Sequence, residues 1–120
     1  MVNPVLVVDD DPAFLALAAQ VLVGLGVGTV LEAGDAATAA AVATAERPGA
    51  VLVDLDLPDR DGLDLARELV ELPWGPRVVL TSTDREAGRA LTAGNDDSAP
   101  PFIAKEELAG GALRRALLGE

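Results

Sequence analysis

Residues 50–62, AVLVDLDLPDRDG, set the organisation of this chain. The segment opens with a short apolar run that has the character of a buried strand and stops at Asp54. Pro58 and Gly62 then mark a turn before a new helical pattern begins. A carboxylate at the end of a buried strand is costly unless a charged group meets it, and in open α/β sheets ligands bind at that end. The segment therefore predicts a sheet with a binding site at Asp54.

The composition indicates one acidic globular domain. The chain has 120 residues, enough for a single core, and we expect one domain over residues 1–120 without an output domain. The formal net charge of −11 argues against direct nucleic-acid binding, because such affinity rests on Lys and Arg. The chain lacks cysteine and histidine, so disulfides, thiolate chemistry and histidine-based catalysis or metal binding are excluded.

The sequence shows neither a signal peptide nor an apolar run that approaches the ~18 residues of a membrane span. We therefore expect a cytoplasmic location and no association with a membrane.

Strand and helix patterns alternate five times along the chain. Apolar runs predict strands at residues 5–8, 27–32, 50–53, 77–80 and 102–104. Helical spacing predicts helices from residue 12 to the glycines at 24 and 26, and over residues 33–46, 63–72, 84–93 and 106–118. A glycine pair inside the last helix is expected to cost about 1 kcal/mol per glycine relative to alanine. The alternation predicts a parallel sheet with helices on both faces.

Several acidic residues are expected to start helices or form turns. Asp11 precedes Pro12 and predicts a helix N-cap, and Asp35 has the same role before the second helix. Asp59 and Asp61 are interpreted as turn residues.

Polar side chains that can carry chemistry follow four of the predicted strands. They are Asp9 and Asp10 after the first, Asp54 after the third, Thr81 and Ser82 after the fourth, and Lys105 after the fifth. Parallel strands end at one edge of a sheet, so we expect one site there. Three carboxylates repel one another, and Mg²⁺, which prefers hard oxygen ligands, would relieve that repulsion. The set suits phosphoryl transfer, with Asp54 as a nucleophile that forms an aspartyl phosphate.

Four segments, in this order, resemble those of response-regulator receiver domains. They are LVVDDDP at residues 6–12, LVDLDLPDRDG at 52–62, VVLTS at 78–82 and FIAK at 102–105. The resemblance covers the whole chain. It implies a flavodoxin-like, doubly wound α/β fold, with a five-stranded parallel sheet in the order 2-1-3-4-5 and five helices.

The resemblance also implies the roles of the acidic residues. Asp54 would accept a phosphoryl group from a histidine kinase or phosphotransfer protein. Asp10 and Asp54 would ligate Mg²⁺ directly, the backbone carbonyl of Asp56 would supply a third ligand, and Asp9 would act through water.

The other site residues receive binding and switching roles from the same resemblance. Thr81 and Lys105 would bind phosphoryl oxygens, together with the backbone N–H of Ser82. Phe102 would be a rotameric switch that moves with Thr81. Their motion would change the surface formed by the fourth helix, fifth strand and fifth helix, and thereby signal to a downstream protein or an excised output domain.

The chain departs from the family pattern at three places. Glu106 stands where most of the family has proline, and the fourth helix is short before a proline-rich loop at residues 95–101. Asp56 adds a carboxylate two residues after the acceptor. Our hypothesis is that its charge disfavours an incoming anionic water or phosphodonor, or adds to metal binding. Unchanged phosphoryl lifetime and Mg²⁺ affinity in Asp56→Asn would contradict this hypothesis.

Two other interpretations stay open from the sequence. The Asp-x-Asp at Asp54 and Asp56 also matches a haloacid-dehalogenase-like phosphatase, although the short chain and the early acidic pair argue against one. A degenerate receiver that only docks to partners is the second alternative. The family also suggests a homodimer through the last helix.

Overall fold

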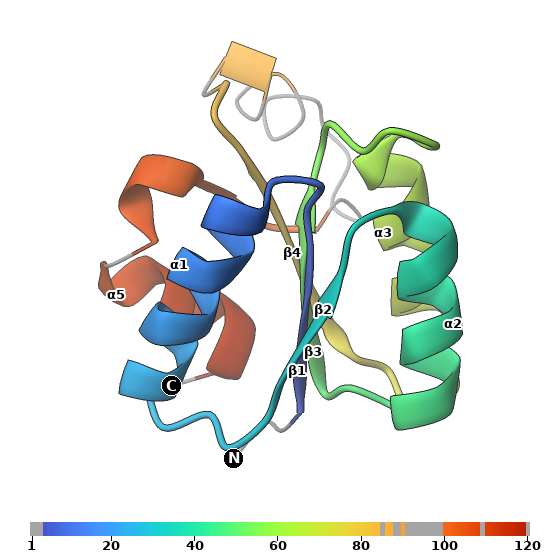
Figure 1. Ribbon diagram of the computed structural model, residues 1–120, viewed down its shortest axis with the longest axis horizontal. Helices are drawn as coiled ribbons and strands as arrows, with labels where there is room; N and C mark the ends of the chain where they lie inside the picture. The colour runs from blue at the N-terminus through green and yellow to red at the C-terminus, as the bar shows by residue number, and fades with distance from the viewer. Residues whose placement is uncertain (1–3, 85, 88–89, 91–99, 109, 120) are drawn as a thin grey trace.

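The computed structural model describes residues 4–84, 86–87, 90, 100–108 and 110–119. Its centre is a parallel five-stranded sheet in the order β2-β1-β3-β4-β5. The strands are β1 (Val5–Val8), β2 (Val30–Ala33), β3 (Ala50–Asp54), β4 (Arg77–Ser82) and β5 (Phe102–Ala104). Figure 1 shows α1 and α5 on one face of this sheet and α2 and α3 on the other. The predicted doubly wound architecture and strand order are confirmed.

Three regular helices follow the first three strands. They are α1 (Pro12–Gly24), α2 (Ala36–Glu46) and α3 (Gly62–Val70). The predicted caps are confirmed, because Asp11 accepts a hydrogen bond from the Ala13 N–H at 3.0 Å and Asp35 accepts one from the Thr38 N–H at 2.7 Å. The predicted fourth helix, residues 84–93, lies largely outside the described residues.

The second strand begins three residues later than predicted, at Val30 rather than Val27. Val27 instead donates its N–H to the Leu22 carbonyl at 3.1 Å, which closes the end of α1, and its side chain is buried. Gly28 lies between this closure and the strand. The apolar run at residues 27–32 therefore divides into the end of the α1 turn and the strand β2.

The prediction of one continuous last helix is wrong within the described residues. The segment contains the 3₁₀ turn η1 (Lys105–Glu107), the short helix α5 (Gly111–Leu113) and the π-helical turn η2 (Arg114–Leu118). Gly110 has an extended backbone, with φ −86° and ψ 168°, and interrupts the helix. The sequence therefore located the weak point of this segment correctly. Gly110 precedes the start of α5 instead of lying inside a continuous helix.

The two faces of the sheet are covered by different kinds of side chain. The cluster beneath α1 and α5 holds large residues such as Phe14, Leu22 and Leu117. On the other face, the three buried residues of α2 are all alanine. Alternate residues of each central strand enter opposite clusters, which explains why β1 and β3 are apolar at nearly every position. Across the described residues, every helix is too short or too polar to serve as a membrane span.

Candidate functional site

The strand register brings the predicted site residues together at one edge of the sheet. Val8 pairs with Val53, so Asp9 and Asp54 follow at the same level on neighbouring strands. Asp54 pairs directly with Thr81. Ser82 pairs with Ala104, which places Lys105 one residue beyond the end of β5. Residues that are far apart in the sequence thus form one site.

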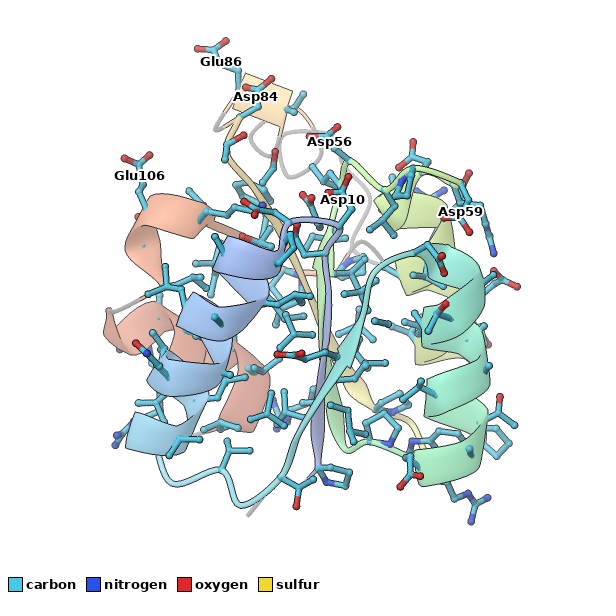
Figure 2. All side chains as sticks on the ribbon, in the orientation of Figure 1. Asp10, Asp56, Asp59, Asp84, Glu86 and Glu106 are labelled. Carbon is cyan, nitrogen blue, oxygen red and sulfur yellow. The ribbon has the colours of Figure 1, made fainter. Side chains whose placement is uncertain are left out.

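Three carboxylates form a potential cation site at this edge. Asp9, Asp10 and Asp54 each offer one oxygen, and these oxygens lie within 4.8 Å of one another. Asp9 and Asp54 are buried, whereas Asp10 is exposed, and Figure 2 shows Asp10 and Asp56 at the upper edge where the strands end. The donor set fits Mg²⁺, because all its side-chain ligands are hard carboxylate oxygens.

Lys105 supplies the opposing positive charge. Its Nζ lies 2.6 Å from Asp9 Oδ2 and 3.7 Å from Asp54 Oδ2. The shorter contact is a close ion pair, while Asp9 Oδ1 accepts the Asp11 N–H at 2.9 Å. Burial alone would lower the pKa of Lys105, but the contact with Asp9 and the charge of Asp54 outweigh it and raise that pKa. The ammonium therefore stays charged beside Asp54.

Asp54 has a strongly perturbed carboxylate. Burial raises its pKa to about 6, and the neighbouring charge of Asp9 adds to the rise. The ammonium of Lys105 and the backbone N–H of Asp56 oppose it. Asp54 is therefore mostly ionised at neutral pH, yet its charge is poorly solvated, so a cation bound beside it would stabilise the ionised form.

The hydroxyl of Thr81 lies fully buried beside this carboxylate. Its Oγ1 has no hydrogen-bond partner among the described residues, and a buried hydroxyl without a partner is costly. Ser82 is also buried, and its Oγ accepts the Asp84 N–H at 3.0 Å. Phe102 is half-buried, pairs with Leu80 in the sheet, and packs on the α2–α3 side.

The β3–α3 loop, residues 55–61, is closed by backbone contacts. The Gly62 N–H donates to the Leu55 carbonyl at 3.0 Å, and Asp56 and Asp61 form a β-bridge. Asp61 also caps α3 by accepting the Leu63 N–H at 2.9 Å. Asp56 points to solvent and lines a pocket of about 210 Å³.

Gly62 is essential to this closure. A Cβ on Gly62 would lie 2.0 Å from the backbone oxygen of Asp54, so any other residue would displace the end of β3 or the start of α3. The turn signal in the sequence located this glycine, but only the structure shows which group it contacts.

Asp59 has a role that sequence reasoning missed. Its two oxygens accept the N–H groups of Ala36 and Ala37, at 2.8 and 3.0 Å, so it ties the loop to the N-terminus of α2. Figure 2 shows Asp59 beside that helix. These hydrogen bonds lower its pKa. The contact joins residues more than 20 positions apart, so local patterns carry no signal for it.

Comparisons with known proteins agree with this geometry. The sequence model of the protein family described as response regulator receiver domain matches residues 5–111 of this chain. The chain belongs to this family. It is 40% identical over 106 residues to the probable transcriptional regulatory protein TcrX of Mycobacterium tuberculosis, covering 85% of this chain and 45% of that protein. It is 39% identical over 108 residues to the DNA-binding response regulator MtrA of Mycolicibacterium smegmatis, covering 88% and 47%.

A solved receiver domain has the same fold. The CheY-like response regulator receiver domain protein of Methanospirillum hungatei JF-1 matches with a TM-score of 0.69 at 29% identity, covering 88% of this chain and 82% of that one. The receiver domain described here spans about half the length of the two curated relatives. The family match supports a receiver of two-component signalling over the phosphatase interpretation.

Proposed function

We propose that Asp54 is the phosphoacceptor of this receiver domain. Its carboxylate would attack the phosphorus of a phosphohistidine on a histidine kinase or phosphotransfer protein. An O–P bond forms as the P–N bond breaks, and the released imidazole takes up a proton. The observation that carries this proposal is the position of Asp54, which is opposite Thr81 in the strand register and lies 3.7 Å from the Lys105 ammonium.

The neighbouring residues would bind the transferred group. Thr81 Oγ1 and Lys105 Nζ would contact phosphoryl oxygens, with help from the backbone N–H of Ser82. A bound oxygen would give the Thr81 hydroxyl the partner that the described part of the chain does not supply. Thr81 and Phe102 would then form the switch that alters the surface around β5 and the segment after it.

The acidic cluster would hold Mg²⁺. Asp10 and Asp54 would be direct ligands, with the Asp56 backbone carbonyl as a third and Asp9 acting through water. When bound, the ion would neutralise charge between the carboxylate and the phosphoryl oxygens. One oxygen of Asp10 already lies within 4.8 Å of oxygens of Asp9 and Asp54.

Intact mass spectrometry after incubation with acetyl phosphate and Mg²⁺ tests this proposal. We expect one added phosphoryl group on the wild type and none on Asp54→Ala. Asp64→Ala, which removes an exposed carboxylate from the first turn of α3, is the matched control and should be labelled normally. An unlabelled wild type, or a labelled Asp54→Ala, would contradict the assignment.

The same incubation separates the receiver from its alternatives. A haloacid-dehalogenase-like phosphatase would turn over phosphate esters repeatedly, whereas a receiver is labelled once per molecule. A degenerate docking module would show neither result.

The partners of the proposed function are a phosphodonor protein and a downstream target, or an output domain elsewhere in a longer regulator. A homodimer through the last helical segment is a further hypothesis. Sedimentation with and without a phosphomimetic tests it, and an unchanged monomer in both states would reject it.

A further inference from the structure

Lys105 has a third neighbour that the phosphoacceptor mechanism does not use. Its Nζ lies 4.2 Å from the centroid of the Phe14 ring, over the ring face. Phe14 belongs to the first turn of α1, and only 5% of it is exposed. The Lys105 side chain is itself 16% exposed. The pair is therefore largely shielded from water, where an attraction between a cation and a ring is strongest.

The Phe14 ring differs in kind from the two carboxylates that also face Lys105. Asp9 and Asp54 attract the ammonium through single oxygens, and both are needed for other tasks in the proposed mechanism. The ring face attracts the charge through its quadrupole, which does not fix the directions of the N–H donors. Lys105 can therefore turn its donors toward phosphoryl oxygens while it keeps the same contact with Phe14.

We infer that Phe14 is a positioning residue for Lys105, and that the negative face of its ring holds the ammonium within reach of both the Asp9 and the Asp54 carboxylates. This inference rests on the proposed phosphoacceptor function. Without the ring, the ammonium would keep only its carboxylate contacts, of which the 2.6 Å pair with Asp9 is the shorter, and it would be held less firmly where it can reach phosphoryl oxygens on Asp54.

Phe14 is also a core residue of the cluster beneath α1, so a simple truncation would not separate the two roles. Packing depends on the shape of the ring, whereas attraction to a cation depends on its charge distribution. Stepwise fluorination weakens the negative ring face and changes the shape little. It therefore tests the positioning role alone.

The experiment replaces Phe14 with 4-fluoro-, 3,5-difluoro- and 3,4,5-trifluorophenylalanine and measures the initial rate of phosphorylation by acetyl phosphate with Mg²⁺. We expect the rate to fall at each step, by about threefold over the series, with an unchanged unfolding midpoint. A constant rate across the series would overturn the inference.

Trp74 provides the matched control. It lies in the loop before β4, and its ring also faces a cation, with Arg47 Cζ 4.9 Å from the ring centroid. Its Nε1–H donates to the Pro48 carbonyl at 2.8 Å, at the opposite end of the sheet from Asp54. Trifluorotryptophan at this position should leave the phosphorylation rate unchanged. An equal loss of rate there would assign the Phe14 effect to general stability.

A second measurement does not depend on phosphorylation. Lys105 is the only lysine in the chain, so selective ¹³C-lysine labelling gives one ε-methylene NMR signal. The Phe14 ring current should shift this signal upfield in the wild type and in Phe14→Tyr, and the shift should be lost in Phe14→Leu. A signal at the value of a free lysine in the wild type would overturn the contact.

The outcomes also separate this inference from the proposed function. If the wild type is not phosphorylated, the proposed function fails, and the lysine signal still tests the contact. If the wild type is phosphorylated but the fluorinated series is flat, only the role of Phe14 fails.

Discussion

The β3–α3 loop and the segment after β5 hold the two halves of the site in different ways. The loop presents the acceptor side, and its shape is set by the Gly62–Leu55 hydrogen bond, the Asp56–Asp61 bridge and the Asp59 contact with α2. The segment after β5 presents Lys105 and consists of three short helical pieces around Gly110. Lys105 is positioned by its own side-chain contacts.

This difference indicates which side of the site can respond to phosphorylation. The Gly62–Leu55 backbone hydrogen bond and the tight packing at Gly62 do not depend on the charge of the Asp54 side chain. The contacts of Lys105 with Asp9 and Asp54 are electrostatic, so a new anionic group on Asp54 redistributes them. We therefore expect the Asp54 side, here called the fixed side, to keep its backbone on phosphorylation, and the lysine side to readjust.

The largest expected effect comes from Gly62→Ala on the fixed side. The new Cβ would lie 2.0 Å from the Asp54 backbone oxygen, and we expect a loss of about 3 kcal/mol or more in unfolding free energy. Urea unfolding measures the loss. Gly24→Ala is the control, because a Cβ there meets no atom within 4 Å and the helical position favours alanine by up to about 1 kcal/mol. Equal stability of the two variants would contradict the interpretation that the β3–α3 loop is tightly constrained.

A smaller effect should follow from the buried charge of Asp54. Its pKa is raised from 3.8 to about 6 in the folded state, so the folded state binds more protons in this range and loses stability as pH rises through it. Relative to Asp54→Asn, the wild type in EDTA should lose about 2 to 3 kcal/mol between pH values near 4 and 7. If the unfolding free energies of the two proteins change equally with pH, the raised pKa of Asp54 would be contradicted.

Asp59→Ala tests the tie between the loop and α2. The lowered pKa means that the ionised carboxylate stabilises the fold above its unfolded pKa of 3.8, and that this contribution is lost as pH falls through the lower folded value. We expect a modest destabilisation at neutral pH, together with slower phosphorylation because the loop is released. Asp35→Ala removes a cap from the same helix but leaves the loop contacts intact. If both variants are phosphorylated at the same rate, the tie has no bearing on the site.

The smallest effect is expected from Gly111→Ala on the lysine side. A Cβ there would meet only the flexible end of Arg115, at 3.2 Å, in the first turn of α5. We expect a gain of about 0.5 kcal/mol in unfolding free energy and normal phosphorylation. Thermal unfolding measures the gain. A loss comparable to that of Gly62→Ala would mean that the two segments are equally constrained.

Much of the fold could be predicted from the sequence because its signals are local. Apolar runs located β1 and β3, and Asp11 and Asp35 cap helices as expected. Strand ends in a parallel sheet share one edge, so the grouping of Asp9, Asp54, Thr81 and Lys105 also followed from their order along the chain.

The remaining features depend on contacts between distant residues. The tie of Asp59 to α2, the Phe14 ring over Lys105 and the approach of Gly62 to Asp54 each join groups that no local pattern relates. The last helix is interrupted at Gly110, whose extended backbone the helical spacing of the leucines did not predict. The sequence by itself therefore determined which residues form the site. How each group is held was decided by tertiary packing, because burial and charge at one residue depend on what the rest of the chain places beside it.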